Sequence, residues 1–263
     1  MNLFEAVILA IVEGVTEFLP ISSTGHMVIT SSLLGIHKEE FTKLFEVAIQ
    51  FGAILAVVVL YARKFFQFSR WQFYVKLLVG VIPALVLGYL FSDRIDAMLE
   101  SPLIVAITML LGGIVLLFID NVFKNPTITK DDQITYGKSF LVGIWQCLAL
   151  IPGVSRSAAS IIGGMQQKFT RQVAAEFSFF LAVPTMFAAS VKSFYDVYKD
   201  HSDVLVSQNY TILAVGAIVS FIVALIAVKS FIHYLQKHGF KAFGIYRIIL
   251  GAVILILIWR GVL

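Results

Sequence analysis

Long apolar runs with almost no charge recur along this chain, and they constrain its fold more than any other feature. The chain has 263 residues, of which 59% are hydrophobic and only 14% are charged. A soluble domain carries about 25% charged residues. Several runs approach the roughly 20 residues that a helix needs to cross about 30 Å of hydrocarbon. Because backbone polar groups cannot stay unpaired in lipid, these runs predict an all-α integral membrane protein.

Three further features narrow the class of protein. The N-terminus has no basic stretch or small-residue cleavage site and is interrupted by Glu5, so we expect the first apolar segment to belong to the mature protein. Cys147 is the single cysteine, which excludes an internal disulfide and a cysteine metal cluster. The net charge of +4 comes from loop lysines and arginines, so it indicates orientation and no nucleic-acid partner.

Loop charges predict how the helices are oriented. The basic connection 63–76 and the connection after Val228, which carries Lys229, Lys237, Lys241 and Arg247, are expected in the cytoplasm. The connection 92–101 holds three acidic residues and one arginine, so we expect it outside, and alternation places 120–138 inside. Six transmembrane helices follow from these anchors, at about 44–62, 76–91, 102–119, 173–191, 208–229 and 245–260.

Two apolar segments are left over by this count, at about 1–36 and about 138–168. Each consists of two short arms joined at a break that contains a proline, Pro20 or Pro152. We therefore expect two re-entrant helical hairpins, the first beginning and ending outside and the second inside. Irregular backbone at this depth is tolerated only where protein buries it or where it lines a wet cavity.

Weak internal matches indicate that the chain is a repeat. At an offset of 133, Ile11–Glu13 lies against Ile144–Gln146, and the apolar string from Val79 resembles that from Val215. Both halves have the order hairpin and then three crossings. Because three is odd, the halves form an inverted-topology repeat, and the hairpins meet near the membrane midplane. We expect one structural domain made of halves 1–130 and 131–263.

The first hairpin carries two glutamates, Glu13 and Glu17, in a run that is otherwise apolar. At a spacing of four residues on a helix, both carboxylates share one face. Two like charges in a low dielectric either share a proton or bind a cation, and Mg²⁺ typically takes one or two carboxylates plus substrate phosphates. The pair is thus a candidate metal site. A solvated helix face or a capping pair is the structural alternative.

A row of hydroxyls and a histidine follow the glutamates. Ser22, Ser23 and Thr24 can cap the next helix and aim backbone N–H groups at an anion. His26 is the only group of the segment that titrates near neutrality, which suits acid or base catalysis. The alternative is a buried histidine with a purely structural role.

The second hairpin carries the motif from Ile151 to Ser160. Pro152 and Gly153 predict a turn, and Ser155 can cap the helix that follows. Arg156 then lies in the first turn, where it opposes the helix dipole, so helix stability does not explain it. A phosphate bound at that terminus would, because guanidinium and free N–H groups converge on anionic oxygens. The alternative is an inter-helix salt bridge from Arg156 to Glu13 or Glu17.

With both motifs placed, the chain closely resembles the bacterial undecaprenyl-diphosphate phosphatases, the bacitracin-resistance family. The resemblance covers nearly the whole chain and rests on four strings, Glu13 to His26, Phe45 to Gln50, Pro152 to Ser157 and Glu176 to Pro184. It implies hydrolysis of undecaprenyl diphosphate to the monophosphate lipid carrier of cell-wall synthesis, with a divalent cation, Mg²⁺ or Ca²⁺. It also implies a multi-pass protein of the bacterial plasma membrane whose site opens to the extracytoplasmic face.

The resemblance places the glutamate pair of the family on Glu13 and Glu17, its histidine on His26 and its Ser-Arg pair on Ser155 and Arg156. Ser160 stands where the family usually has threonine, so the hydroxyl is kept and the methyl group is lost. Three other polar residues at membrane depth are expected to be supporting or interfacial and not catalytic, namely Glu46, Gln50 and Glu176.

We therefore expect phosphoryl transfer, with Ser23 as candidate nucleophile and His26 as its acid or base; direct attack by water is the alternative. Glu13 and Glu17 would hold the cation. The expected phosphate-binding residues are Ser22, Thr24, Gly153, Ser155, Arg156, Ser157 and Ser160. The partners would be the polyprenyl lipid substrate and membrane lipid, and a homodimer is possible. A different class stays open, because inverted repeats with paired hairpins also occur in transporters; a flippase for the lipid carrier is its specific form.

Overall fold

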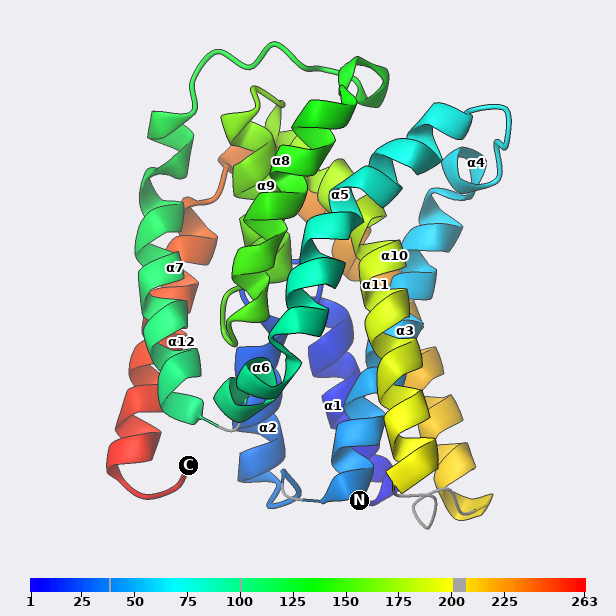
Figure 1. The fold of residues 1–263 in the computed structure, drawn as a ribbon. Helices are drawn as coiled ribbons and strands as arrows, with labels where there is room; N and C mark the ends of the chain where they lie inside the picture. The colour runs from blue at the N-terminus through cyan, green and yellow to red at the C-terminus, as the bar shows by residue number, and fades with distance from the viewer. Residues whose placement is uncertain (38, 100, 201–206) are drawn as a thin grey trace.

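A computed structural model of the chain describes residues 1–37, 39–99, 101–200 and 207–263 (Figure 1). Helices are its regular elements, together with one isolated bridge between Ile128 and Phe169 in the described part of the chain. The expectation of an all-helical protein is thereby confirmed.

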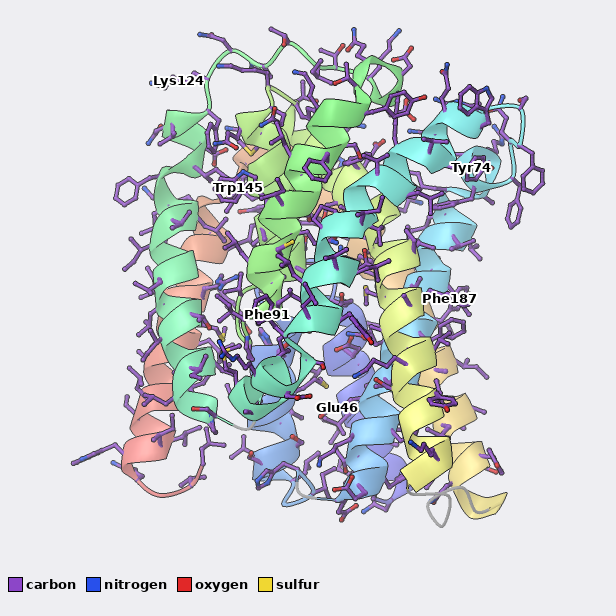
Figure 2. All side chains as sticks on the ribbon, viewed as in Figure 1. Glu46, Tyr74, Phe91, Lys124, Trp145 and Phe187 are labelled. Carbon is purple, nitrogen blue, oxygen red and sulfur yellow. The ribbon has the colours of Figure 1, made fainter. Side chains whose placement is uncertain are left out.

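Six helices are long and apolar enough to cross a membrane. They are α3 (Glu40–Leu60), α5 (Trp71–Leu90), α7 (Pro102–Val122), α10 (Arg171–Asp200), α11 (Ser207–His238) and α12 (Lys241–Trp259). Each of the six predicted crossings corresponds to one of these helices, with most ends shifted by up to five residues, while α10 and α11 end at Asp200 and His238, well beyond the predicted 191 and 229. Large apolar side chains stand out around the bundle (Figure 2), and Phe187, for example, is 52% exposed. Such a surface is stable in lipid and not in water.

Two pairs of shorter helices occupy the segments that the count of crossings left over. The first pair is α1 (Leu3–Thr16) and α2 (Ser23–Leu33), and the second is α8 (Tyr136–Gln146) and α9 (Arg156–Gln166), with the short 3₁₀ helix η2 (Cys147–Leu150) before the second break. In Figure 1, α1 and α2 lie in the lower half of the view, and α8 and α9 lie in the upper half. The breaks at Pro20 and Pro152 lie between the arms, as predicted.

The N-termini of these short helices are capped by side chains. Asn2 and Glu5 form a capping box on α1, and Ser22, Thr135 and Ser155 each accept a hydrogen bond from a backbone N–H of the helix that follows. Side-chain caps satisfy N–H groups that a helix leaves unpaired, which is essential where no water is available. Polar residues within the apolar segments thus have a structural role as well.

The remaining helical segments lie in the connections: α4 (Ala62–Phe65), α6 (Ser92–Leu99) and the 3₁₀ helix η1 (Asp131–Gln133). The acidic connection 92–101, expected as a loop, therefore contains a helix. The segment is short and mixes apolar with polar residues, so its sequence does not distinguish a helix from a loop.

Each helix pair packs on the other half of the chain. Helix α1 lies against α11, and α8 lies against α5. Glycines permit the close approach: a methyl group at Gly143 of α8 would overlap the backbone of Gly80 in α5, and one at Gly14 of α1 would come within 2.7 Å of the Ser220 carbonyl. In lipid, such close packing between small residues is a main source of helix association.

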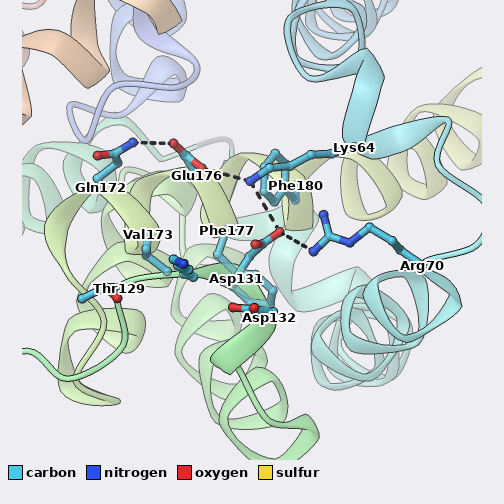
Figure 3. A pocket seen from close by; sticks show the side chains of 11 residues that line it. Lys64, Arg70, Thr129, Asp131, Asp132, Gln172, Val173, Glu176, Phe177 and Phe180 are labelled. Atoms are coloured by element: carbon cyan, nitrogen blue, oxygen red, sulfur yellow. Dashed lines mark hydrogen bonds and ion pairs between the residues drawn. The ribbon is translucent and has the colours of Figure 1, made fainter.

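A cluster of ion pairs joins two connections and helix α10 at one end of the bundle (Figure 3). Lys64 lies 3.4 Å from Asp131 and 3.3 Å from Glu176, and Arg70 lies 3.3 Å from Asp131. These residues line a cavity of about 230 Å³. Burial by itself would raise the pKa of Asp131, but Lys64 and Arg70 outweigh it and lower that pKa below its usual value.

The cluster predicts a pH dependence of stability. Because the folded-state pKa of Asp131 is depressed, the stabilisation is present above the unfolded-state value of about 3.9 and is lost as the pH falls through the folded-state value. The melting temperature of the wild type in detergent should exceed that of Asp131→Asn at pH 7, and the difference should shrink below about pH 4.

Asp93→Asn, which removes an exposed carboxylate on α6, is the control and should show no such trend. A difference between wild type and Asp131→Asn that stays constant down to low pH would show that the charge of Asp131 does not stabilise the fold.

Candidate active site

The two breaks in the short helix pairs touch each other. The Ser157 hydroxyl donates a hydrogen bond of 2.8 Å to the Phe18 carbonyl, and the Ser155 hydroxyl donates one of 3.4 Å to the Leu19 carbonyl. The residues joined by these two bonds are 139 and 136 positions apart in the sequence. The structure thus brings the two polar motifs together.

A cavity of about 200 Å³ lies where the two breaks meet. Its polar lining from the two short helix pairs comprises Glu17, Ser22, Ser23, Thr24, Gln146, Ser155 and Arg156. The neighbouring long helices add Gln50 of α3, Ala84 of α5 and Thr185, Met186 and Ala189 of α10. The cavity therefore has a polar floor and partly apolar walls, which suits a lipid with a charged head group.

Arg156 is the central cation of the cavity. Its Nη2 donates a hydrogen bond of 2.9 Å to Glu17 Oε1, and Nη1 donates one of 3.1 Å to the Ser178 carbonyl. The guanidinium also lies over the Phe18 ring, 5.5 Å from its centroid, while Nε is buried with no hydrogen-bond partner among the described residues. The salt bridge considered from sequence is confirmed for Glu17. An unpaired Nε leaves one donor available to an anion.

Glu17 also binds the candidate nucleophile. The Ser23 hydroxyl donates a hydrogen bond of 2.6 Å to Glu17 Oε2, so the two carboxylate oxygens serve Arg156 and Ser23 separately. The preceding Ser22 has φ 68° and ψ 95°, a conformation that non-glycine residues rarely adopt. Strain of this kind often occurs at functional sites, where the surrounding structure holds it in place.

His26 does not line the cavity. Its Nδ1 donates a hydrogen bond of 2.7 Å to the Ser22 carbonyl, and its Nε2 is 2.7 Å from the Tyr246 hydroxyl. The carbonyl can only accept, so Nδ1 carries the hydrogen and, in the neutral ring, Nε2 accepts from Tyr246. The structure therefore pairs Ser23 with Glu17 and His26 with Tyr246, and does not form the expected pair of Ser23 and His26.

Glu13 lies behind Glu17. It is 2% exposed, it interacts with Glu17 and with the nearby Glu46 (Figure 2), and its Oε1 has no hydrogen-bond partner among the described residues. A buried, unpaired carboxylate oxygen beside a second carboxylate fits a divalent cation. No cluster of three or more metal-binding side chains was found in the described residues. The chain could thus contribute two carboxylates, and substrate phosphates would have to provide further ligands.

Other predicted phosphate-binding residues support the cavity from behind. Ser157 binds the Phe18 carbonyl, and Ser160 lies 2.6 Å from the Ser178 hydroxyl and donates to the Arg156 carbonyl. Gly153 has φ +83°, and a side chain there would approach the Val105 carbonyl to 2.7 Å. Neither serine nor Gly153 lines the cavity. A hydroxyl at position 160 keeps its bonding role without the methyl group of threonine.

Two other charged residues that the sequence analysis placed, Glu176 and Arg247, do not line the cavity. Glu176 lies in the ion-pair cluster with Lys64, as expected for an interfacial residue. The placement of Arg247 in a cytoplasmic loop is wrong, because α12 begins at Lys241 and Arg247 is only 1% exposed inside it. The signal was present in the sequence: Arg247 is the one charge between Lys241 and Arg260.

Sequence reasoning missed three cavity partners that lie on long helices. Ser178 accepts a hydrogen bond from Arg156 through its carbonyl, and Thr185 accepts one of 3.1 Å from Gln146 Nε2. Met186 contacts Arg156 through its sulfur at 3.4 Å. All three lie in or next to the string from Glu176 to Pro184, but small polar residues in a crossing carry no distinct pattern of their own.

This arrangement has the chemistry of an anion site that can move a proton. A helix N-terminus and a guanidinium attract a phosphate, and both lie in surroundings that strengthen electrostatic interactions. A serine hydroxyl that donates to a carboxylate is set up to lose its proton as it attacks. Phosphoryl transfer depends mainly on such positioning and charge stabilisation.

Known proteins resemble the chain over nearly its whole length. The family model "Bacitracin resistance protein BacA" matches residues 6–253. The undecaprenyl-diphosphatase of Flavobacterium psychrophilum is 59% identical, with 98% of this chain and 96% of the relative covered. That of Porphyromonas gingivalis is 48% identical, with 100% and 99% covered, and that of Aquifex aeolicus is 44% identical, with 96% and 97% covered. The chain therefore belongs to the BacA family of bacitracin resistance proteins.

Proposed function

We propose that this chain is an undecaprenyl-diphosphatase, which hydrolyses undecaprenyl diphosphate to undecaprenyl phosphate and inorganic phosphate. It would thereby recycle the lipid carrier of bacterial cell-wall synthesis and confer bacitracin resistance. The observation that carries the proposal is the cavity in which Arg156, Glu17 and Ser23 are hydrogen-bonded in a row. The relatives named undecaprenyl-diphosphatase support the substrate.

Arg156 and the N-terminus of α9 bind the diphosphate in this mechanism. The Nε of Arg156 has no hydrogen-bond partner among the described residues, the first turn of α9 has free N–H groups, and Ser155, Ser22 and Thr24 add polar atoms to the same lining. The partly apolar walls lead the prenyl chain out between helices, so only the head group enters the cavity. An incoming phosphate would compete with Glu17 for Arg156 and loosen their ion pair.

Ser23 is the nucleophile and Glu17 its base. The Ser23 oxygen attacks the terminal phosphorus as its proton passes to Glu17 Oε2, and the bond from that phosphorus to the bridging oxygen breaks, releasing undecaprenyl phosphate. Glu17 gives that proton up to an oxygen of the departing undecaprenyl phosphate and is a carboxylate again. Water then attacks the phosphorus as it gives a proton to Glu17, the bond from phosphorus to the Ser23 oxygen breaks, and that oxygen takes the proton back as free phosphate leaves. Direct attack by water, with Glu17 as base, is the alternative. His26 holds the start of α2 through Ser22 and Tyr246.

Glu13 and Glu17 are the residues that would hold a divalent cation, Mg²⁺ or Ca²⁺. Bound there, the cation supplies charge neutralisation for the diphosphate. Glu13 is suited to this role because its unpaired oxygen is buried beside Glu17.

The two short helix pairs are, in this proposal, re-entrant hairpins of an inverted repeat with halves 1–130 and 131–263 in one domain. The packing supports it: α1 lies on α11 of the second half, and α8 lies on α5 of the first. Exchanging α1 with α8 and α11 with α5 turns one of these contacts into the other, and α7 and α12, the last crossings of the two halves, lie against each other. An inverted repeat produces such reciprocal contacts.

The active site would open to the extracytoplasmic face of the plasma membrane. The end with the ion-pair cluster also holds the basic connection 63–76, which supports a cytoplasmic location for that end. The homodimer stays a prediction, which the mass of the protein in detergent would test.

Phosphate release by the purified protein in detergent tests the activity, because no transport is possible there. With Mg²⁺ or Ca²⁺ present, the wild type should hydrolyse undecaprenyl diphosphate. Arg156→Ala and Glu17→Gln should lower kcat/KM by about 10²-fold or more, the usual effect of losing one charge-stabilising group. Arg260→Ala, an exposed arginine at the end of α12, is the matched control and should stay at the wild-type value.

Full hydrolysis by Arg156→Ala and Glu17→Gln would refute the site. If the wild type releases no phosphate but moves the lipid between the leaflets of vesicles, the protein is a flippase and not a phosphatase.

The nucleophile is tested by acid-quenching the enzyme with substrate labelled in its terminal phosphate. A serine nucleophile predicts that label is retained on Ser23 and that Ser23→Ala loses both label and hydrolysis. Ser31→Ala, a buried serine of α2 that binds the Met27 carbonyl, should keep both. Hydrolysis by Ser23→Ala within about tenfold of wild type would favour water as the nucleophile.

Sidedness is tested with single cysteines in a Cys147→Ser background. A membrane-impermeant maleimide should label His37→Cys in intact cells, and Lys124→Cys, at the end with the ion-pair cluster (Figure 2), only after the membrane is opened. The reverse pattern would show that the proposed orientation is wrong.

A further inference from the structure

Arg247 is the largest fully buried side chain among the described residues, and it lies on α12 (Lys241–Trp259), in the second turn of the helix. Its guanidinium donates to four backbone carbonyls: Nη1 to Pro20 at 3.3 Å, Nη2 to Gly153 at 3.0 Å and to Thr108 at 3.2 Å, and Nε to Met109 at 3.4 Å. It forms no ion pair with any of the described residues. Its charge is therefore balanced by carbonyl dipoles.

A buried cation without a carboxylate is costly, and stability alone does not explain it. Charges lose their hydration on burial, and apolar residues of similar size usually pack as well or better. The same helix face is otherwise apolar, with Ile254 packed on α7. The guanidinium is thus retained for the groups that it binds.

Two of those groups belong to the two hairpin breaks. Pro20 precedes Ser23 by three residues, and Gly153 precedes Arg156 by three residues. One guanidinium therefore binds the backbone three residues before the nucleophile and three residues before the phosphate-binding arginine. The remaining two acceptors, Thr108 and Met109, fix that guanidinium to α7.

We infer that Arg247 is a positioning residue for the reaction, which sets the separation of Ser23 from Arg156 by holding both breaks from one point. This inference rests on the proposed function. The neighbouring Tyr246 acts in the same way on α2, since its hydroxyl binds His26. Helix α12 thus aligns the site without contributing a group that touches the substrate.

Lysine cannot replace arginine in this role. The guanidinium is a planar fork with five N–H donors, which reach carbonyls in several directions at once, whereas the lysine ammonium is a point charge on a flexible stem. The direct bond from Ser157 to Phe18 still ties the breaks together, so Arg247→Lys should keep the fold and loosen the alignment.

The test compares Arg247→Lys with Ile254→Ala. Ile254 is fully buried in the same α7–α12 interface, and its apolar side chain cannot form hydrogen bonds to the breaks, so it controls for lost packing. Well below both melting temperatures, Arg247→Lys should lower kcat for undecaprenyl diphosphate about 10- to 100-fold with KM within about threefold, since small misplacements act on the transition state. Ile254→Ala should keep kcat within about threefold.

A wild-type kcat in Arg247→Lys, or an equal loss in both variants, would overturn the inference. If Arg247→Lys does not fold, Gly112→Ala decides: its methyl group would come within 2.8 Å of Arg247 Cζ and displace the guanidinium. A lowered kcat supports the positioning role, and an unchanged kcat refutes it. An inactive wild type would instead refute the proposed function, so the two failures are distinguishable.

Discussion

The ion pair between Arg156 and Glu17 is the interaction on which the site depends. It joins the two halves of the chain at 2.9 Å, in surroundings where both side chains are almost entirely buried. Either charge alone would be strongly unfavourable there, so each of the two short helix pairs requires the other. The same pair prepares the chemistry, because Glu17 also accepts the Ser23 hydrogen bond and Arg156 keeps one donor unpaired. Stability and function therefore impose a single requirement on these residues.

The backbone around that pair is irregular, and side chains satisfy it. Where a helix is interrupted at a depth that water does not reach, its carbonyl groups need hydrogen-bond partners from the rest of the protein. Arg247 binds those of Pro20 and Gly153, and Thr108 donates to that of Pro152 at 2.7 Å. Helices α7 and α12, which contribute no group to the cavity lining, thus hold the shape of the cavity.

The crossings and both motifs could be predicted from sequence because they depend on local composition. Long apolar runs require helices in lipid, and Glu13, Glu17 and Arg156 are conspicuous at that depth. Which side chains bind one another could not be predicted, because that depends on how the helices pack. His26 was expected beside Ser23, yet α12 brings Tyr246 to it. Arg247 was counted with its basic neighbours as a loop charge, since a single charge near a helix end does not show on which side of the boundary it lies.

The most direct measurement is the location of a non-hydrolysable diphosphate lipid analogue bound to the purified protein, by crystallography or electron cryo-microscopy. A phosphate site built jointly by the two breaks predicts density for the head group between Arg156 and Ser23, with the guanidinium drawn away from Glu17. Density at the other cavity, beside Lys64 and Arg70, would contradict it. Head-group density in contact with only one of the two short helix pairs would also contradict it.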